Sequence, residues 1–183
     1  MKGFKIPLAI IALVFGGFAA IGIVQPSVEY GVSVDVSRDR MTTWNVMVAD
    51  DLMSEWVDGF KSVELIEGEM NTVGSKYEVV IQQEGEEFIM VETLTVVEPG
   101  KRLAFSIEND VLTTQLDITF EAGTDGGTKV TTHNVAQGKG WFYRSLFSLM
   151  LSSFQEQEAK NYNAFAELVD RSDIDVFLEE KES

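Results

Sequence analysis

The chain opens with a long apolar run and then changes to alternating and helical patterns. No charged side chain falls between Ile6 and Val24. At a rise of about 1.5 Å per residue, this run approaches the ~20 residues that cross the hydrocarbon core of a bilayer. Lys2 and Lys5 precede the run, and no further Lys or Arg follows until Arg38. The positive-inside rule therefore predicts a cytoplasmic N-terminus, with the rest of the chain outside the cytoplasm.

Two interpretations of this segment remain open. An uncleaved transmembrane helix is the favoured one, because apolar residues continue through Ile23 and Val24, further than a signal peptide needs. The alternative is a signal peptide cleaved after the small residues Gly17 and Ala19. Both place the folded part beyond the cytoplasmic membrane, so we expect a single-pass protein of that membrane with an extracytoplasmic domain.

The next segment predicts one strand and two short helices. Apolar residues alternate with polar or small ones over Val28–Val36, which is the pattern of a half-buried strand. Ser37 is a suitable N-cap for a following helix, in which Met41, Trp44 and Val48 share a face. A second short helical piece is expected from Asp50 to Trp56.

Strands separated by turn residues follow, and a helix closes the pattern. Six further strands are expected, at 62–68, 76–83, 88–97, 103–108, 112–120 and 129–136. The segment 141–170 lacks Pro and Gly and predicts one helix of about 30 residues. A curling meander must bury its apolar face against something large, and only this helix is long enough. The pattern indicates an α+β fold, a curved antiparallel sheet of six to seven strands around a long C-terminal helix.

Composition bounds the number of domains and the chemistry. With 183 residues, the chain suits one well-cored domain, and we divide it into an anchor at 1–25, a domain at 26–170 and an acidic tail at 171–183. The 14 Lys and Arg against 30 Asp and Glu give a net charge of −16, which argues against nucleic acid as a partner. The absence of Cys excludes disulfides, thiolate metal sites and thiol nucleophiles.

Several stretches resemble a known superfamily. They are YGVSVDVS from Tyr30, DDLMSEWVDGFKSVELIEGEMNTVGSKYEVVI from Asp50, VVEPGKRLAFSI and GTDGGTKVTTHN. In order and spacing they are similar to the START/Bet v 1-like (SRPBCC) superfamily, and within it to the bacterial polyketide cyclase/dehydrase and lipid-transport group. The resemblance runs from about Tyr30 to Val169. It departs at Ser37-Arg38-Asp39, where the family often carries a Pro.

The resemblance implies a helix-grip fold, in which a curved antiparallel sheet wraps around a C-terminal helix and encloses a hydrophobic cavity. Carriers, enzymes and co-chaperone-like domains share that scaffold, so the fold alone does not choose among them. From alternation and resemblance together we expect apolar lining from Trp44, Trp56, Tyr77, Phe88, Met90, Phe105, Leu116, Met150 and Phe154. Glu92, Thr132 and Asn134 are the expected polar contacts.

Two titratable residues are candidates for a catalytic role. His133 is the only histidine, and a structural or solvent-facing role is favoured for it, since a catalytic His needs an orienting carboxylate and a substrate in reach. Glu92 faces the cavity if Phe88 and Met90 do, and it could then act as an acid or base. In the opposite register Glu92 faces water, and this second register is favoured.

Metal and cofactor motifs are not found in the sequence. Asp50-Asp51 and the acidic residues at 84–87 lack the spaced ligands of a calcium loop, and they are interpreted as a solvated surface. The DGGT at 125–128 is interpreted as a hairpin turn. We therefore predict no metal, no cofactor and no identifiable catalytic residue, and leave enzymatic activity undecided.

The first half of the last helix, WFYRSLFSLML, is apolar on nearly every side. Burial under the two short helices is favoured, and an apolar entrance or a surface facing a bilayer is the alternative. The predicted function is binding of a small hydrophobic molecule, lipid-like or polyketide-like, in an internal cavity of a membrane-anchored domain. The alternatives are a cyclase or dehydratase acting on a polyketide-like substrate, and a protein-interaction module with a filled core.

Overall fold

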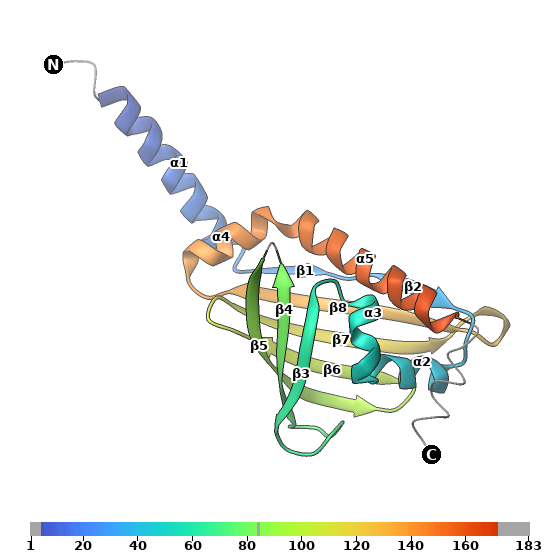
Figure 1. The fold of residues 1–183 in the computed structure, drawn as a ribbon. Coiled ribbons are helices and arrows are strands. Elements are labelled where there is room, and N and C mark those ends of the chain that lie inside the picture. The colour runs from blue at the N-terminus through green and yellow to red at the C-terminus, as the bar shows by residue number, and fades with distance from the viewer. Residues whose placement is uncertain (1–4, 84, 172–183) are drawn as a thin grey trace.

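An eight-stranded antiparallel sheet forms the body of the molecule (Figure 1). The computed structural model describes residues 5–83 and 85–171. Neighbouring strands follow the order β1-β8-β7-β6-β5-β4-β3, and β2 also pairs with β8. The strands are β1 (Ser27–Tyr30), β2 (Ser33–Val36), β3 (Phe60–Glu67), β4 (Lys76–Gln83), β5 (Glu86–Glu98), β6 (Arg102–Glu108), β7 (Leu112–Ala122) and β8 (Thr128–Gly138). The α+β class and the curved sheet with a long C-terminal helix agree with the prediction.

The strand count differs from the expected six to seven because the first predicted strand is two strands. β1 and β2 pair with different parts of β8, and Gly31 lies between them. A Cβ atom at Gly31 would overlap the carbonyl oxygen of Thr132, so the backbones approach too closely there for any side chain. Alternation of apolar residues continues across this break, which is why the pattern alone predicted one strand.

Three short helical elements follow the first two strands. They are α2 (Arg40–Met47), the 3₁₀ turn η1 (Asp50–Leu52) and α3 (Met53–Trp56). The predicted N-cap at Ser37 is wrong: Asp39 caps α2, and its Oδ1 accepts hydrogen bonds from the amides of Met41 (2.8 Å) and Thr42 (3.2 Å). Ser37 donates instead to Asp170 at 2.8 Å, which ties the start of α2 to the end of the C-terminal helix.

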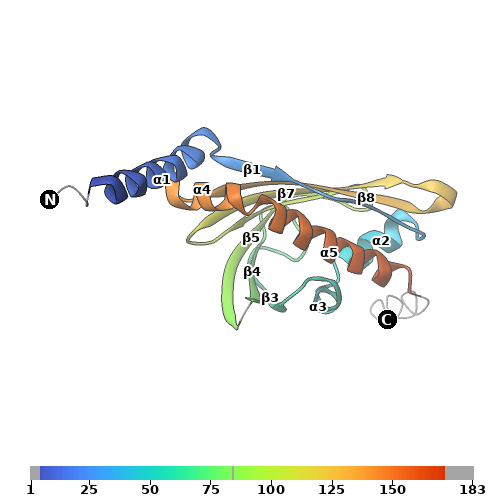
Figure 2. The same ribbon diagram turned by 90° about the horizontal axis from the view of Figure 1, so that it is seen from above.

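The C-terminal helix is two helices, α4 (Trp141–Leu149) and α5 (Leu151–Val169), with a break at Met150. The amide of Met150 donates to the carbonyls of both Leu146 and Phe147, so the helical turn tightens at this point. Figure 2 shows α4 lying beside α1 and α5 running along the sheet. The predicted single helix of about 30 residues is therefore wrong, and its apolar first half packs on α1, β8 and β1 rather than under α2 and α3.

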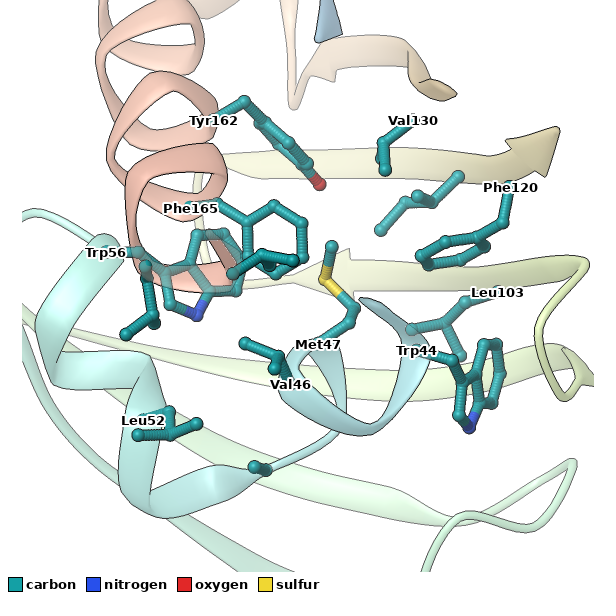
Figure 3. Packing of buried hydrophobic residues seen from close by; sticks show 14 of the residues in the cluster. Trp44, Val46, Met47, Leu52, Trp56, Leu103, Phe120, Val130, Tyr162 and Phe165 are labelled. Atoms are coloured by element: carbon teal, nitrogen blue, oxygen red, sulfur yellow. The ribbon is translucent and has the colours of Figure 1, made fainter. Parts of the chain in front are cut away.

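The hydrophobic core lies at the far end of α5, where α2 and α3 close over the sheet (Figure 3). Phe165 of α5 is fully buried, and its ring packs edge-on to Trp56 at 5.2 Å between centroids. Trp44 of α2 packs on Phe120 of β7 at 5.6 Å. Full burial of such side chains contributes about 1.5–3 kcal/mol each. This end of the molecule is therefore well packed.

The N-terminal helix α1 (Lys5–Val24) packs against α4. The amide of Gly22 donates to the Ser145 hydroxyl at 3.0 Å, and the Phe18 ring lies 6.2 Å from Trp141 and 5.6 Å from Phe142. The predicted transmembrane helix is not found, because no helix in the described part of the chain has both the length and the apolar character to cross a membrane. The predicted acidic tail falls almost wholly on residues 172–183, outside the described residues.

Candidate functional site

A cavity of about 490 Å³ lies between the curved sheet and α5. Figure 2 shows that β3, β4 and β5 curl away from the layer of β7 and β8 on the side where α3 lies. Side chains of β1 and of β3 to β8 line one wall, and side chains from the helical elements α2, η1, α3, α4 and α5 line the other. The lining is predominantly apolar, which is typical of sites for small hydrophobic molecules.

Strand register builds the sheet wall of the cavity. Residues directly opposite each other on adjacent strands share a face, so a row of partners crosses the sheet on its inner side. Two such rows line the cavity. One runs through Tyr30, Asn134, Leu116, Phe105 and Leu94, and the other through Tyr77, Glu92 and Ile107.

Nine of the twelve residues expected at a ligand site line this cavity. They are Trp56, Tyr77, Phe88, Met90, Glu92, Phe105, Leu116, Asn134 and Phe154. They come from α3, β4, β5, β6, β7, β8 and α5, so only the fold brings them together. Contact of these residues with a ligand stays a prediction.

The other three expected residues lie elsewhere. Trp44 is 5% exposed and belongs to the packed core against Phe120. Met150 is 38% exposed at the break between α4 and α5. Thr132 is buried, and its hydroxyl donates to Glu158 rather than into the cavity. Trp44 lies on α2, Met150 between α4 and α5 and Thr132 on β8, and these placements depend on tertiary packing, which local periodicity does not report.

Glu92 faces the cavity, so the expectation that it faces water is wrong. Its partner across the strands is Tyr77, which is 5% exposed and lines the same cavity. β4 and β5 pair without a bulge from Lys76 to Gln83, so the face is fixed over that whole length. Burial, and then the nearby charge of Asp50, raises the pKa of Glu92 to about 7. The cavity therefore holds a carboxyl group that changes its charge near neutral pH.

A second cavity carboxylate, Glu158 of α5, was missed by the sequence analysis. Asn134 Nδ2 donates to both of its oxygens at 2.7 Å, and the Thr132 hydroxyl donates to Oε1. Burial raises the pKa of Glu158, while these hydrogen bonds and the charge of His133 oppose the rise. A signal was present in the sequence: Glu158 lies four residues from both Phe154 and Tyr162, so it shares a helix face with these two aromatic residues.

Aromatic residues surround the two carboxyl groups. Tyr30 stacks on Phe154 with centroids 5.6 Å apart. Burial, and then the charge of Glu158, raises the pKa of Tyr30 to about 12. Tyr162 is buried on α5, and burial followed by the charges of Glu158 and Glu92 raises its pKa as well. Both phenols therefore remain neutral at physiological pH and can serve as hydrogen-bond donors.

The remaining chemical candidates lie away from the cavity or lack partners. His133 is exposed on the outer face of β8, as the favoured prediction has it. Among the described residues, no cluster of three or more His, Cys, Asp or Glu could hold a metal ion. The Trp56 Nε1 atom is buried without a hydrogen-bond partner in the part of the chain that the structure describes.

Comparisons with known proteins agree on one family and one fold. The family model of the activator of Hsp90 ATPase homolog 1-like proteins matches residues 37–169. A search of curated protein sequences found no significant match.

Solved structures with the same fold have low sequence identity. Ara h 8.0201 is 14% identical with a TM-score of 0.62, and the match covers 78% of this chain and 97% of that one. A conserved protein from Geobacillus kaustophilus is 16% identical with a TM-score of 0.63, covering 78% of this chain and 95% of its own. Protein CV1439 from Chromobacterium violaceum is 15% identical with a TM-score of 0.60, covering 79% and 99%. The family match and these structures confirm the predicted START/Bet v 1-like superfamily and its helix-grip fold.

Proposed function

Because this chain belongs to the family of activator of Hsp90 ATPase homolog 1-like proteins, within a superfamily of helix-grip folds, we propose that it binds a small hydrophobic molecule in its internal cavity. The fold class is compatible with this function. A lipid-like or polyketide-like molecule is the proposed occupant, and the mass of a bound molecule would identify it.

The cavity itself is the observation that carries the proposal. Sites for small molecules typically measure about 300–1,000 Å³ and are lined by apolar and aromatic side chains with few polar groups. The cavity of about 490 Å³ meets both criteria. Native interiors otherwise contain few voids larger than a water molecule. A space of this size between the sheet and α5 therefore argues against the filled core of a pure interaction module.

Native mass spectrometry of the full chain tests the proposal. The protein is exposed to a total lipid extract, desalted and then measured. We expect a saturable one-to-one complex with a hydrophobic molecule. The matched variants are Leu116→Trp, which places an indole ring in the cavity, and Gln115→Trp, which adds the same ring on the exposed face of β7. Loss of the complex only in Leu116→Trp supports the proposal, and equal adducts on all three proteins contradict it.

A second candidate function is proton-transfer catalysis, of the kind that a cyclase or dehydratase performs on a polyketide-like substrate. The orientation of Glu92 favours it, because a carboxyl group with a pKa of about 7 is suited to act as acid and base at neutral pH. Glu92→Gln separates the two functions. An enzyme loses turnover of its substrate in this variant while binding persists, and a carrier has no turnover to lose.

We further propose that the N-terminal segment directs the domain to the extracytoplasmic side of the cytoplasmic membrane. The asymmetry of positive charge supports this localisation, with Lys2 and Lys5 ahead of the uncharged run and the next base at Arg38. A phosphatase fused after the domain should be active only if it is exported. Activity of a cytoplasm-dependent reporter at the same position contradicts the proposal.

A further inference from the structure

The charged groups that line the cavity all have the same sign. Asp50, Asp58, Glu92 and Glu158 contribute acidic side chains, and no Lys, Arg or His is present among the described lining residues. Asp58 forms an ion pair with the exposed Lys160, with 2.9 Å between Asp58 Oδ2 and Lys160 Nζ. The charge of Asp58 is therefore compensated outside the cavity. The inference therefore concerns Glu92 and Glu158, the two glutamates of the lining.

Glu92 and Glu158 differ in the hydrogen bonds that the protein donates to their carboxyl oxygens. Glu158 accepts hydrogen bonds from Thr132 and from Asn134, which occupy its oxygens. Glu92 lines the same cavity, and no described group donates a hydrogen bond to it. Glu92 is partly buried, and desolvation disfavours the charged form of a carboxyl group that has no donor nearby. Glu92 is thus the polar group of the cavity that a ligand can satisfy.

The surroundings of Glu92 suit a cation. Tyr77 lies opposite on β4, and Tyr162 of α5 is close enough for its ionisation to be affected by Glu92. Aromatic faces attract ammonium groups, most strongly where water is excluded. A bound carboxylate would meet Glu92 and Glu158 with no described basic residue on the lining to pair with.

We propose that the ligand of this cavity is an amphipathic amine, whose alkyl or ring body fills the apolar space and whose ammonium group pairs with the Glu92 carboxylate. This inference rests on the proposed function and names its ligand class. It excludes fatty acids and other anionic lipids as preferred ligands, although their hydrophobic bodies would suit the same space.

Binding of an amine is linked to the ionisation of Glu92. The titratable groups around Glu92 are Asp50 on η1, Tyr77 on β4, and Glu158 and Tyr162 on α5. Burial raises the pKa of Tyr162, so the charged groups that an ammonium group meets on the described lining are carboxyl groups. In the free protein Glu92 has a pKa of about 7, and pairing with a cation favours its charged form. Affinity for an amine should therefore rise with pH between about 5 and 8, while the amine itself, with a pKa near 10, stays charged.

Isothermal titration of the full chain with decylamine, decanol and sodium decanoate, each below its micelle concentration, tests the inference. The three probes share an alkyl chain and differ in the charge of the head group. At about pH 8 we expect decylamine to bind roughly tenfold or more tightly than decanoate, with decanol between them. Lowering the pH to about 6 should weaken decylamine and strengthen decanoate, since Glu92 is then mostly neutral while decanoate keeps its charge.

Two variants separate the effect of Glu92 from that of total charge. Glu92→Gln should lower the preference for decylamine over decanoate by roughly tenfold. Glu78→Gln removes the same charge from the adjacent strand β4, where Glu78 lies outside the cavity lining, and should leave the preference unchanged. Equal or tighter binding of decanoate at about pH 8, or a preference that survives in Glu92→Gln, overturns the inference. Failure of decanol to bind contradicts the proposed function itself, and the inference falls with it.

Discussion

At the scale of single residues, two glutamates on facing walls of one cavity have different surroundings. Glu158 is held by Thr132 and Asn134, which replace the water that the carboxylate loses on burial. Glu92 receives no such replacement, and burial raises its pKa to about 7. Glu158 is consequently a structural acid of the α5–β8 contact, and Glu92 is the carboxyl group that we propose to pair with a ligand.

The surroundings of Glu92 make stability depend on pH in a definite direction. Its pKa is higher in the folded state than in the unfolded chain, so folding takes up a proton between about pH 4.5 and pH 7, and this costs stability as pH rises. Glu92→Gln removes the dependence. We expect the variant to be more stable than the parent by up to about 3 kcal/mol at pH 8 and nearly equal to it at pH 4. Urea unfolding at both pH values measures the difference.

Loss of a hydrogen-bond donor to Glu158 should lower stability, whereas Glu92→Gln should raise it. Asn134→Ala leaves the buried carboxylate with fewer donors and should lower the free energy of unfolding by about 1–3 kcal/mol at neutral pH. The loss should shrink in acid, where Glu158 is protonated. Gln137→Ala, at an exposed position of the same strand, is the control. An equal loss in both variants would mean that strand propensity, and not the carboxylate, is responsible.

At the scale of secondary-structure elements, periodicity in the sequence predicted the positions of the strands. It did not predict the two breaks, which depend on close contacts between distant parts of the chain. Alternation located β3 to β8 to within a few residues. The division at Gly31 depends on the Thr132 carbonyl, and the break at Met150 depends on α4 turning toward α1. Both partners are more than a hundred residues away in the chain, so no local pattern reports them.

The contact between α1 and α4 depends on one glycine. A Cβ atom at Gly22 would overlap the carbonyl oxygen of Trp141 and the hydroxyl of Ser145, whereas one at Gly17 would meet nothing within 4 Å. Gly22→Ala should weaken the contact by about 1–3 kcal/mol. Gly17→Ala should leave the contact intact and stabilise the helix by up to about 1 kcal/mol.

Hydrogen exchange of the amides in α1 and α4 distinguishes these outcomes. Faster exchange on both helices in Gly22→Ala, together with unchanged or slower exchange in Gly17→Ala, is the expected pattern. Identical exchange in the two variants would show that α1 does not depend on close approach to α4.

At the scale of the whole molecule, packing is divided between a filled end and a hollow end. The tail of α5 meets α2, α3 and the sheet in a core that includes Phe165, Val130 and Phe120. Toward α4 the same helix and sheet separate and border the cavity. Without Cys the molecule has no disulfide to support it, so stability comes from the filled end and from any occupant of the hollow one.

The division into a filled end and a hollow end also limits how much of the cavity could be predicted from the sequence. Alternation identified the inward residues Leu116, Phe105 and Met90 as cavity or core without telling the two apart. Helical spacing has the same limit, because it predicted an inward Trp44 and this residue lies in the filled end. The register at Glu92 was also undecidable, since both faces of β5 carry apolar residues. The pairing of β5 with β4 and β6 decides that register.

Isothermal titration of decanol into the full chain and into its Leu116→Trp and Gln115→Trp variants tests the central claim most directly. We predict saturable one-to-one binding to the parent with a negative change in heat capacity, as apolar surface is buried. Binding should be lost in Leu116→Trp and kept in Gln115→Trp, with both variants folded by circular dichroism. Absence of saturable binding to the parent, or binding that Leu116→Trp leaves unchanged, would contradict a ligand site in this cavity.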